Sequence, residues 1–522
     1  MSNFRAFDAF DYHAHYKSSR CFVESDLGSI SYGEAAIKVD SIINGFRALG
    51  ICSCDRIAVI AKNRAEVLLL LLASLKGGPV VVPVNNRLAP AEMAWILEDS
   101  ECKAVIAESE FIQALEGKIP SRIPPDVRFQ LDGVVPEWIN FDGWLVMQSS
   151  QVAEPSNQTD KPYLQVYTSG TTGQPKGVVL TEKNCLGQQL GLMATLETTL
   201  QPGDKVYQAL PLFHVGGIFV TLWAVYRGAT LIFRRDFSPA VTEDLMARGD
   251  VQHVALVPAM IKACLTVGAN IPRKFDGLKS IIYGASPITA ETLRLSAQRY
   301  RCGFIQIYGM TETHSVISVL TPKDHERALN GERECLIASA GRPIAGTKIK
   351  IESPEGEALP VGQIGEICVR APQVMAGYWK RDEATKEAIK NDYLYTGDAG
   401  YVDQEGYLHI VDRLKDIIVS GGENVASKEV EEILLRHPQV ADAAVIGIPD
   451  ERWGEAVKAI IVCTESGLDE ASLIEHCKQH LGGFKVPKSI SLIDAIPRNG
   501  AGKVLKNKLR ERYWSGEARR VS

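Results

Sequence analysis

Short apolar runs with strand character alternate with helical patterns along much of this 522-residue chain. Residues 56–61 and 79–84 are rich in valine, isoleucine and alanine, and residues 64–75 between them carry a helical pattern. Further strand-like runs lie at residues 206–210, 251–257, 280–283 and 303–307. Because parallel neighbours need a crossover connection, usually a helix, this alternation predicts an α/β fold with mixed or mostly parallel sheets covered by helices.

The pattern changes in the C-terminal third of the chain. After Glu352, short strands and turns follow one another, which predicts a β-rich subdomain. From residue 429 a new alternation of helices and strands predicts a small α+β domain of about a hundred residues. The polar segment 412–415 joins two apolar strands and is the expected boundary. We therefore expect a large N-terminal domain, residues 1–413, and a small C-terminal domain, residues 414–522.

The composition is that of an ordinary globular protein, with 45% hydrophobic and 23% charged residues and a formal net charge of −6. This charge argues against a general nucleic-acid or anionic-membrane binder. The most apolar run, residues 67–73, is far shorter than the roughly 20 residues that span a bilayer. The first residues lack the pattern of a secretory signal, and the eleven cysteines are scattered, as reduced thiols are. We expect a cytoplasmic protein with no membrane span.

The segment 168–177, TSGTTGQPKG, concentrates residue types that bind phosphate. Its glycines let the backbone bend around a polyanion and present amide and hydroxyl donors, and its lysine adds a positive charge. A Walker-type loop needs glycine before the lysine and serine or threonine after it, whereas Pro175 and Gly177 stand there. The alternative is a plain surface loop, which the density of hydroxyls and the Pro-Lys-Gly exit disfavour. The candidate phosphate-binding residues are Thr168, Ser169, Gly170, Thr171, Thr172, Gly173 and Lys176.

This loop resembles the signature of the adenylate-forming superfamily, which includes acyl-CoA synthetases, adenylation domains of peptide synthetases and beetle luciferases. Five later segments match the family's motifs in the same order. They are residues 308–312 (YGMTE), 395–398 (YTGD), 412–416 (DRLKD), 420–424 (SGGEN) and 500–503 (GAGK). One departure follows Val425, where many relatives carry Tyr-Pro and this chain carries Ala426 and Ser427. The departure weakens the match to any particular subfamily.

The resemblance implies the parts of an ATP site. Tyr308 offers an aromatic face for a purine, Thr311 can donate to an α-phosphate, and Glu312 is a hard oxygen ligand for Mg²⁺. Asp398 can accept from both ribose hydroxyls, and Arg413 adds a fork of donors. The family also places small residues around the nucleotide, here Gly284, Ala285, Ser286 and Gly309. The alternatives are an ordinary exposed glutamate and a turn-forming aspartate.

The resemblance also implies two steps at one site. Lys503 would bridge the carboxylate and the α-phosphate during adenylation, because a cation offsets the repulsion of two anions. A mobile small domain would then turn about Lys415, which removes Lys503 and admits a thiol. Gly421 and Gly422 would line the path of the thiol, and Trp453 would lie near the nucleotide end of coenzyme A. An ordinary exposed lysine is the alternative for Lys415.

The segment 211–217, PLFHVGG, resembles the start of the family's acyl pocket, with His214 as a catalytic gate near the carboxylate. A buried structural histidine is the alternative. Amino-acid-activating relatives hold the substrate ammonium with an aspartate here, and this chain has none nearby, so we expect a substrate without an α-ammonium group. The candidate lining residues are Val215, Gly216, Val257, Met260, Tyr283, Met310 and His314. Their mainly apolar character favours a fatty, alicyclic or aryl acid; the alternative is that they belong to the core.

We therefore expect an AMP-forming acid–thiol ligase. A carboxylate and ATP would give acyl-adenylate and pyrophosphate, and coenzyme A would then give acyl-CoA and AMP, with Mg²⁺ as the metal. A ligase that loads a carrier-protein phosphopantetheine is the alternative, because it would share every adenylation residue. A non-catalytic nucleotide-binding protein is disfavoured, because Lys503, Glu312 and Asp398 are all present. The expected partners are the acid and coenzyme A but no nucleic acid, the expected setting is fatty-acid metabolism, and a homodimer is left open.

Overall fold

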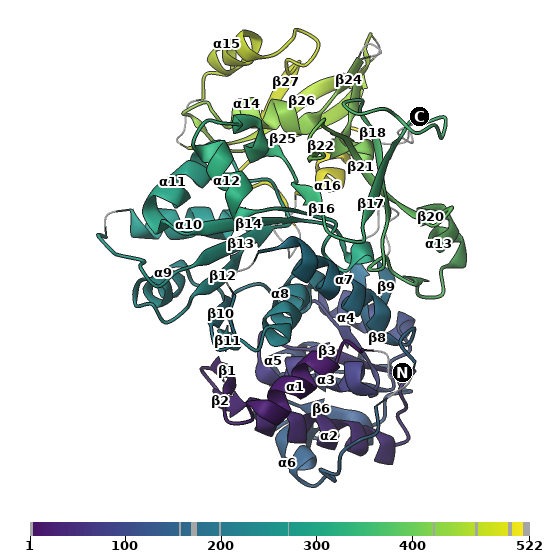
Figure 1. The fold of residues 1–522 in the computed structure, drawn as a ribbon. Coiled ribbons are helices and arrows are strands. Elements are labelled where there is room, and N and C mark those ends of the chain that lie inside the picture. Colours follow the sequence, from purple (N-terminus) through teal and green to yellow (C-terminus); the bar gives the residue numbers. More distant parts are fainter. Residues whose placement is uncertain are drawn as a thin grey trace. The chain divides into compact units, whose positions relative to one another are not determined.

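The computed structural model describes residues 4–155, 158–168, 175–197, 200–269, 271–420, 423–450, 452–464, 468–498 and 504–514, with the backbone alone at Asn424. The chain forms two compact units. Unit 1 comprises Met1–Lys348 and Arg370–Leu394, and unit 2 comprises Ile349–Val369 and Tyr395–Ser522. Figure 1 labels the helices and strands of both units.

Unit 1 contains two large sheets. The first has eight strands in the order β19-β9-β8-β4-β3-β5-β6-β7. Neighbours are parallel from β8 to β7, whereas β8, β9 and β19 pair antiparallel. The strands are β3 (Arg56–Ile60), β4 (Val80–Pro83), β5 (Ala104–Ala107), β6 (Arg128–Gln130), β7 (Ile139–Asn140), β8 (Pro162–Thr168), β9 (Lys176–Thr181) and β19 (Gly377–Tyr378). Strands β3, β4 and β5 are buried along their whole length, as expected for a parallel sheet covered on both faces.

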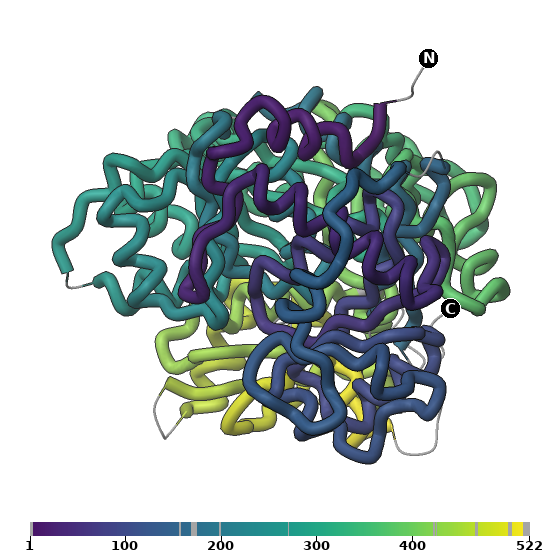
Figure 2. The backbone as a smooth tube through the Cα atoms, turned by 90° about the horizontal axis from the view of Figure 1, so that it is seen from below, coloured from purple at the N-terminus to yellow at the C-terminus, as the bar shows by residue number. Residues whose placement is uncertain are grey.

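The second sheet has nine strands in the order β16-β15-β14-β13-β12-β10-β11-β1-β2. Its middle, from β14 to β1, is parallel, and the outer pairs are antiparallel. The strands are β1 (Cys21–Ser25), β2 (Gly28–Ser31), β10 (Lys205–Gln208), β11 (Thr230–Phe233), β12 (His253–Leu256), β13 (Ser280–Gly284), β14 (Gly303–Tyr308), β15 (Ser318–Leu320) and β16 (Arg342–Pro343). Because β1 pairs with β11, the N-terminal segment lies beside a segment from the middle of the chain (Figure 2).

Helices connect the parallel strands of unit 1. Helix α3 (Ala65–Lys76) links β3 to β4 and buries its run of leucines. Helix α8 (Val215–Tyr226) links β10 to β11, and every residue of it except Gly216 is buried, so it is a core helix. The other helices are α1 (Asp8–Tyr16), α2 (Tyr32–Ala48), α4 (Pro90–Asp99), α5 (Ser109–Ala114), α6 (Phe141–Val146), α7 (Glu182–Thr195), α9 (Pro239–Ala247), α10 (Pro258–Gly268), α11 (Ala290–Tyr300), α12 (Pro322–Leu329) and α13 (Asp382–Ala388).

Unit 2 contains a small β-rich part and an α+β part. The β-rich part consists of β17 (Lys348–Glu352), β18 (Gly365–Arg370), β21 (Tyr393–Val402) and β22 (Leu408–Arg413). The first residues of β21, and strand β20 (Ile389–Lys390) that pairs with them, fall in unit 1. The α+β part consists of β23 (Ile418–Ser420), β24 (Glu423–Val425), β25 (Val440–Asp450), β26 (Gly454–Cys463), β27 (Ser489–Leu492), α14 (Ser427–Leu434), α15 (Glu470–His480) and α16 (Lys506–Arg510). The latter part has its own apolar core, formed by side chains of β25, β26, α14 and α15.

The α/β fold predicted from the sequence is confirmed, including the β-rich stretch after Glu352 and the α+β part that follows. The boundaries of the two compact units differ from those of the predicted domains. The short strands after Ile349 belong to the same compact unit as the C-terminal segment. The boundary that matters for catalysis, near Lys415, stays a prediction.

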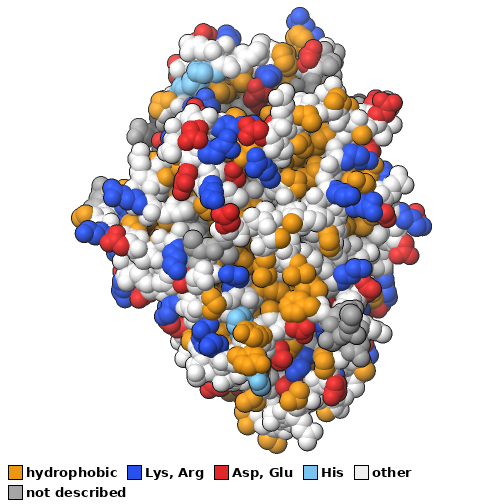
Figure 3. Space-filling view, in the orientation of Figure 1, with side chains coloured by type: hydrophobic (Ala, Val, Ile, Leu, Met, Phe, Trp, Pro, Cys, Tyr) orange, Lys and Arg blue, Asp and Glu red, His pale blue; other side chains and the backbone are white. Residues whose placement is uncertain are grey.

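The described surface carries both signs of charge. On the face in Figure 3, lysine and arginine side chains are interspersed with aspartate and glutamate. None of the helices in the described ranges combines the length and the apolar character needed to cross a membrane.

Candidate active site

The predicted phosphate loop connects two antiparallel strands of unit 1. Thr168 ends β8 and Lys176 begins β9, and these two residues are direct partners across the strand pair. The two strands therefore stay paired up to the loop, and Lys176 is itself the first residue of a sheet strand. The predicted loop residues Ser169, Gly170, Thr171, Thr172 and Gly173 lie outside the described residues.

Lys176 and Glu312 are connected through a tyrosine that sequence reasoning did not select. The Nζ atom of Lys176 lies 5.1 Å from the centroid of the Tyr378 ring. The Tyr378 hydroxyl donates to Glu312 Oε1 at 2.9 Å. Glu312 is only 7% exposed, and its backbone carbonyl accepts from the Met375 N–H at 2.8 Å. A lysine, a tyrosine and a buried carboxylate thus form one cluster.

Tyr378 lies in this cluster because of sheet pairing. The short strand β19 pairs antiparallel with β9, which sets Tyr378 opposite Val178, two residues after Lys176. Burial, and then the neighbouring Glu312, raise the pKa of Tyr378 well above its usual value. The hydroxyl therefore keeps its proton and remains a donor to the carboxylate. In the sequence, a Gly-Tyr-Trp triplet far downstream of Glu312 gives no signal of this contact.

The ends of β13 and β14 carry the predicted nucleotide residues on neighbouring parallel strands. Gly284 is opposite Ile307, and a Cβ added to Gly284 would lie 2.4 Å from the Ile307 carbonyl oxygen. A Cβ added to Gly309 would lie 2.1 Å from the Ser315 carbonyl oxygen. Only glycine permits these close backbone approaches. Ala285 and Ser286 are exposed, and Tyr308 and Thr311 are half-buried.

Three residues at this edge have left-handed backbone conformations without being glycine. They are Ala285 at φ 67°, His314 at φ 50° and Ser315 at φ 81°. Such conformations cost of order 1 kcal/mol or more each and are kept only where the surrounding structure enforces them, which is common at functional sites.

His314 is held inside unit 1 rather than free to line a pocket. It is 0% exposed, the Tyr163 hydroxyl lies 2.5 Å from its Nε2, and Gln188 donates to its carbonyl. Burial lowers the pKa of His314 to about 4, so the imidazole is neutral at pH 7. Its buried Nδ1 has no hydrogen-bond partner among the described residues.

Tyr283 is similarly engaged in the interior. It is 2% exposed, and its hydroxyl contacts His325 Nε2 at 2.8 Å and Gln306 Oε1 at 3.2 Å. The other predicted lining residues near this edge, Val257, Met260 and Met310, are half-buried. The half-buried residues retain surface that a bound molecule can contact.

His214 lies at the start of helix α8. It is the N-cap residue of that helix and is half-buried. Its Nε2 atom is buried and has no hydrogen-bond partner among the described residues. Burial, and then the positive charge of Arg87, lower the pKa of His214 to about 4, so it too is neutral at pH 7. A Cβ added to Gly216 would lie 3.8 Å from Ser315 Oγ, so the first turn of α8 lies beside the 309–315 segment.

Asn63 is a second residue that sequence reasoning missed. Its Oδ1 accepts from the Leu212 N–H at 2.9 Å, and its Nδ2 donates to the carbonyls of Leu210 at 3.0 Å and Gln208 at 3.5 Å. Asn63 is 6% exposed. It therefore fastens the turn that leads from β10 to His214 onto the end of β3.

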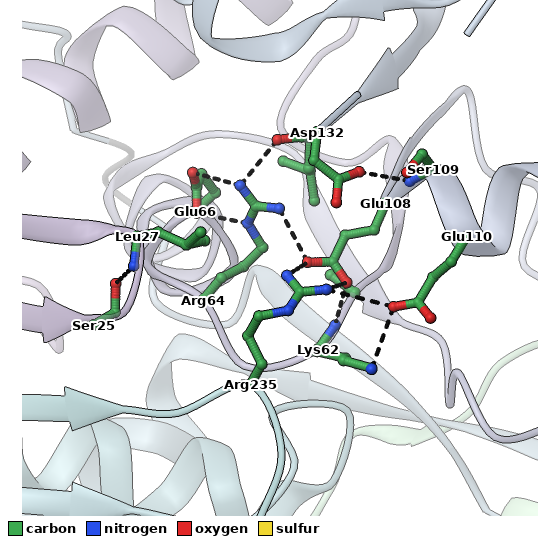
Figure 4. A network of polar contacts seen from close by, with 12 residues as sticks. Ser25, Leu27, Lys62, Arg64, Glu66, Glu108, Ser109, Glu110, Asp132 and Arg235 are labelled. Carbon is green, nitrogen blue, oxygen red and sulfur yellow. Dashed lines mark hydrogen bonds and ion pairs between the residues drawn. The ribbon is translucent and has the colours of Figure 1, made fainter. Parts of the chain in front are cut away.

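An ion-pair network includes Lys62 and Arg64, the two sequence neighbours of Asn63 (Figure 4). The carboxylate of Glu108, at the end of β5, is 0% exposed. It accepts from Arg64 Nη1 at 3.0 Å and from Arg235 Nη1 at 2.5 Å, and its Oε2 accepts from the Lys62 N–H at 3.1 Å. Because Arg235 follows β11 of the second sheet, the network ties both sheets of unit 1 together beside the turn held by Asn63.

In unit 2, two predicted ribose residues form an ion pair. Asp398 and Arg413 are direct partners on β21 and β22, and Arg413 Nε lies 2.9 Å from Asp398 Oδ1. The Asp398 side chain is 8% exposed and that of Arg413 is 32% exposed. The N–H of Asp398 donates to Thr396 Oγ1 at 3.1 Å. This pairing orients both side chains.

The residues predicted for the hinge and the thiol path also lie in unit 2. Lys415 is exposed and sits in a short 3₁₀ turn, η4 (Leu414–Asp416), between β22 and β23. Trp453 is half-buried before β26, and the cations of Arg452 and Lys488 lie 4.8 and 5.8 Å from its ring centroid. The predicted residues Gly421, Gly422 and Lys503 lie outside the described residues.

The fold and the site together define an enzyme that activates a carboxylate with a nucleotide. The chain belongs to the AMP-binding enzyme family, whose model matches residues 10–379, and the model of the AMP-binding enzyme C-terminal domain matches residues 429–503. It is a member of the acyl-CoA synthetase branch of the adenylate-forming superfamily. The family resemblance predicted from the sequence motifs is confirmed.

Curated relatives extend over nearly the whole chain. The chain is 34% identical over 515 residues to the fatty acid–[acyl-carrier-protein] ligase ScoC of Streptomyces coeruleorubidus, covering 98% of this chain and 97% of the relative. It is 34% identical to the long-chain-fatty-acid–CoA ligase FadD13 of Mycobacterium tuberculosis, covering 89% and 90%. It is 35% identical to a feruloyl-CoA synthase of Amycolatopsis sp, covering 93% and 94%.

Solved structures agree on the fold. The ATP-bound MatB from Rhodopseudomonas palustris matches with a TM-score of 0.86 and 29% identity, covering 98% of this chain and 99% of that one. The o-succinylbenzoate CoA synthetase MenE from Bacillus subtilis, in complex with its acyl-adenylate, matches with a TM-score of 0.83 and 28% identity, covering 99% of both chains.

Proposed function

We propose that this chain is an ATP-dependent acyl-CoA ligase acting on an apolar carboxylic acid. In the first step a carboxylate oxygen attacks the α-phosphorus of ATP, and pyrophosphate leaves. In the second step the thiol of coenzyme A attacks the acyl carbon, AMP leaves with the electron pair of the broken C–O bond, and the thiol proton is released. The observation that carries the proposal is the cluster of Lys176, Tyr378 and the buried Glu312, which combines a phosphate cation with a metal-binding carboxylate.

Lys176 and Glu312 would act on the polyphosphate. The ammonium of Lys176 suits a phosphate as a point charge. Glu312 suits Mg²⁺ because it is an anionic oxygen donor whose position is held by a tyrosine hydroxyl. A Mg²⁺ ion held there would neutralise part of the phosphate charge. Thr311, the neighbour of Glu312, would donate to the α-phosphate.

We assign the adenine to the edge formed by Gly284, Ala285, Ser286, Tyr308 and Gly309, where small residues leave the strand ends accessible. We assign the ribose hydroxyls to Asp398, because an ionised carboxylate can accept from both. Its partner Arg413 would fix the orientation of the carboxylate.

The acid would lie beside the first turn of α8. The neutral His214 can offer one hydrogen bond there without adding a positive charge. Val215, Gly216, Val257, Met260 and Met310 are the proposed apolar contacts, while Tyr283 and His314 would support them from the interior. This assignment supports an acid without an α-ammonium group, of fatty, alicyclic or aryl type.

The two steps would require a domain turn. We assign adenylation to Lys503 and the hinge to Lys415, with residues 1–413 and 414–522 as the moving parts. The thiol would then pass Gly421 and Gly422, with Trp453 near the nucleotide end of coenzyme A. Relief of the charge contact between Lys503 and the phosphate is what frees the site for the thiol.

The setting proposed for this reaction is the cytoplasm, where ATP and coenzyme A are available, and the proposed assembly is a homodimer. Fractionation of the native host and light scattering of the purified protein test these two points.

Mass spectrometry tests the reaction. The protein is incubated with ATP, Mg²⁺, coenzyme A and a panel of short to long fatty, aryl and alicyclic acids. The expected result is an acyl-CoA together with AMP for at least one acid. Acyl-adenylate without thioester, followed by transfer to a phosphopantetheinylated carrier protein, would instead favour the activity named for the ScoC relative. No adenylate with any acid would contradict the proposal.

A further inference from the structure

The segment between the two parts of unit 2 is bridged by a buried carboxylate and a serine. Strand β22 ends just before the turn Leu414–Asp416, and α14 begins at Ser427 after it. Asp412 Oδ2 accepts from the Ser427 N–H at 2.6 Å and from its Oγ–H at 2.5 Å. Asp412 is 7% exposed and Ser427 is 0% exposed. The contact fastens the last strand before the turn to the first helix after it.

A lysine from the C-terminal helix completes the arrangement. Lys506 Nζ lies 2.8 Å from Glu431 Oε1 on α14 and donates to Ser427 Oγ. The side chains of Lys506 and Glu431 are 10% and 18% exposed. Ser427 is thus held between the carboxylate of Asp412 and the ammonium of Lys506, and both contacts are charge-assisted.

The same helix also contacts the turn itself. Arg510 Nη1 lies 2.8 Å from Asp416 Oδ1, and both side chains are nearly buried. Helix α16 is therefore tied to α14 by Lys506 and to the turn by Arg510. Because Lys506 follows Lys503 by three residues, these contacts anchor the chain directly after the proposed adenylation lysine.

Ser427 is one of the two residues at which this chain departs from the Tyr-Pro of many relatives. A proline at position 427 has neither an N–H nor a hydroxyl, so it could make neither of the two bonds to Asp412. The contact between Ser427 and Asp412 is therefore one that a relative with proline at this position could not make.

We propose that Ser427 is a positioning residue that clamps one orientation of the small domain about Lys415 and so sets the balance between adenylation and thioester formation. The inference rests on the proposed function, since it needs a domain turn between two half-reactions. A rotation of the small domain about residues 414–416 changes the distance between groups before and after these residues. The Asp412–Ser427 hydrogen bonds therefore exist in one orientation of the small domain only. Removing charge-assisted buried bonds should shift the equilibrium between orientations by about tenfold.

The test measures the two half-reactions separately in four variants. Adenylation is followed by pyrophosphate exchange, and thioester formation by the reaction of supplied acyl-adenylate with coenzyme A. Ser427→Ala removes the hydroxyl, Ser427→Pro removes both donors, and Ser427→Thr keeps both. Ser489→Ala is the matched control, because Ser489 accepts from Lys458 at 3.1 Å in the same unit but away from the turn.

The expected result is that Ser427→Ala changes the two rates in opposite directions, so that their ratio moves by about tenfold. Ser427→Pro should move the ratio further, and Ser427→Thr and Ser489→Ala should leave it within about twofold of the wild-type ratio. If the Ser427→Ala variant unfolds below the assay temperature, Lys506→Met should change the ratio of the two rates in the same direction as Ser427→Pro.

Two failures are distinguishable. A wild-type protein that catalyses neither half-reaction with any acid of the panel would contradict the proposed function itself. A wild-type protein that catalyses both, together with a Ser427→Ala variant whose two rates are unchanged or fall in parallel, would overturn the clamp alone.

Discussion

The hydroxyl of Tyr378 donates to Glu312 Oε1 at 2.9 Å across a sequence separation of 66 residues. The same ring lies 5.1 Å from Lys176 Nζ. One side chain therefore connects the exit of the phosphate loop with the carboxylate proposed for Mg²⁺. Groups that orient a metal-binding carboxylate commonly affect metal affinity by ten- to a hundredfold.

Tyr378→Phe should raise the Mg²⁺ concentration needed for half-maximal pyrophosphate exchange by about tenfold, because the carboxylate loses its orienting donor. The rate at saturating Mg²⁺ should change much less. Tyr300→Phe is the matched control, since Tyr300 donates to Glu243 Oε1 at 2.6 Å elsewhere in unit 1. An unchanged Mg²⁺ midpoint in Tyr378→Phe would argue against Glu312 as the metal ligand.

Asn63→Ala should weaken binding of the acid, because three hydrogen bonds that hold residues 208–212 before His214 are lost. We expect the KM for the acid to rise by about tenfold while the KM for ATP stays within about twofold. Asn44→Ala is the control, because Asn44 also donates to two backbone carbonyls but on the exposed part of α2. Equal changes in both KM values would point to a general structural role instead.

Tyr378 and Asn63 illustrate what the sequence could not predict. Lys176 and Glu312 lie in short contiguous motifs whose residue types already suggest phosphate and metal chemistry. Tyr378 and Asn63 act through tertiary contacts, one by the pairing of β19 with β9 and the other by crossing from one sheet to the turn of another. Such contacts depend on sheet order, which no local pattern specifies.

The predicted residues of the acyl pocket show a second limit of prediction from the sequence. Apolar and aromatic residues near a motif are also the residues of a core. Tyr283 and His314 are both buried and hydrogen-bonded to other side chains, whereas Met260 and Met310 retain exposed surface. Sequence proximity to the site could not separate the two groups, but the alternation of strands and helices was sufficient to predict the α/β class.

The stability of the protein should fall as the pH is lowered from 7 to 5. Burial lowers the pKa of His314 and of His325 to about 4, whereas an unfolded histidine titrates near 6.5. Between these values the unfolded chain binds protons that the folded chain does not, so each histidine should destabilise the fold by about 2 kcal/mol at pH 5. Thermal midpoints measured at pH 7 and 5 check this.

His325→Gln should make the fall in the thermal midpoint smaller, because glutamine keeps hydrogen-bonding capacity and does not titrate. His325 is the better choice for this substitution, since it contacts Tyr283 and Thr321 rather than the proposed phosphate cluster. His15→Gln, on the exposed face of α1, should leave the pH dependence of the wild-type protein intact. A His325→Gln variant with the full wild-type loss would mean that other groups cause it.

Lys503→Ala should reduce the rate of pyrophosphate exchange by about a hundredfold or more, because the cation that we propose to bring the carboxylate and the α-phosphate together is lost. Thioester formation from supplied acyl-adenylate should stay near the wild-type rate, since the proposed domain rotation removes Lys503 from the site in that step. Lys508→Ala, a nearby lysine on α16, is the control. Equal loss of both half-reactions would remove Lys503 from its assigned role.

Lys415→Pro should have the opposite effect and spare adenylation while blocking thioester formation. Proline fixes φ near −65° and also restricts the residue before it, so the turn Leu414–Asp416 would lose the backbone freedom that a domain turn needs. Lys415→Ala separates this backbone effect from the side chain, because it removes the ammonium and keeps the freedom of φ and ψ. Stopped-flow measurement of the thioester step should therefore show a block in Lys415→Pro and near-normal transfer in Lys415→Ala. Normal transfer in both variants would place the pivot outside residues 414–416. A block in both variants would mean that the second step requires the ammonium of Lys415 rather than its backbone freedom.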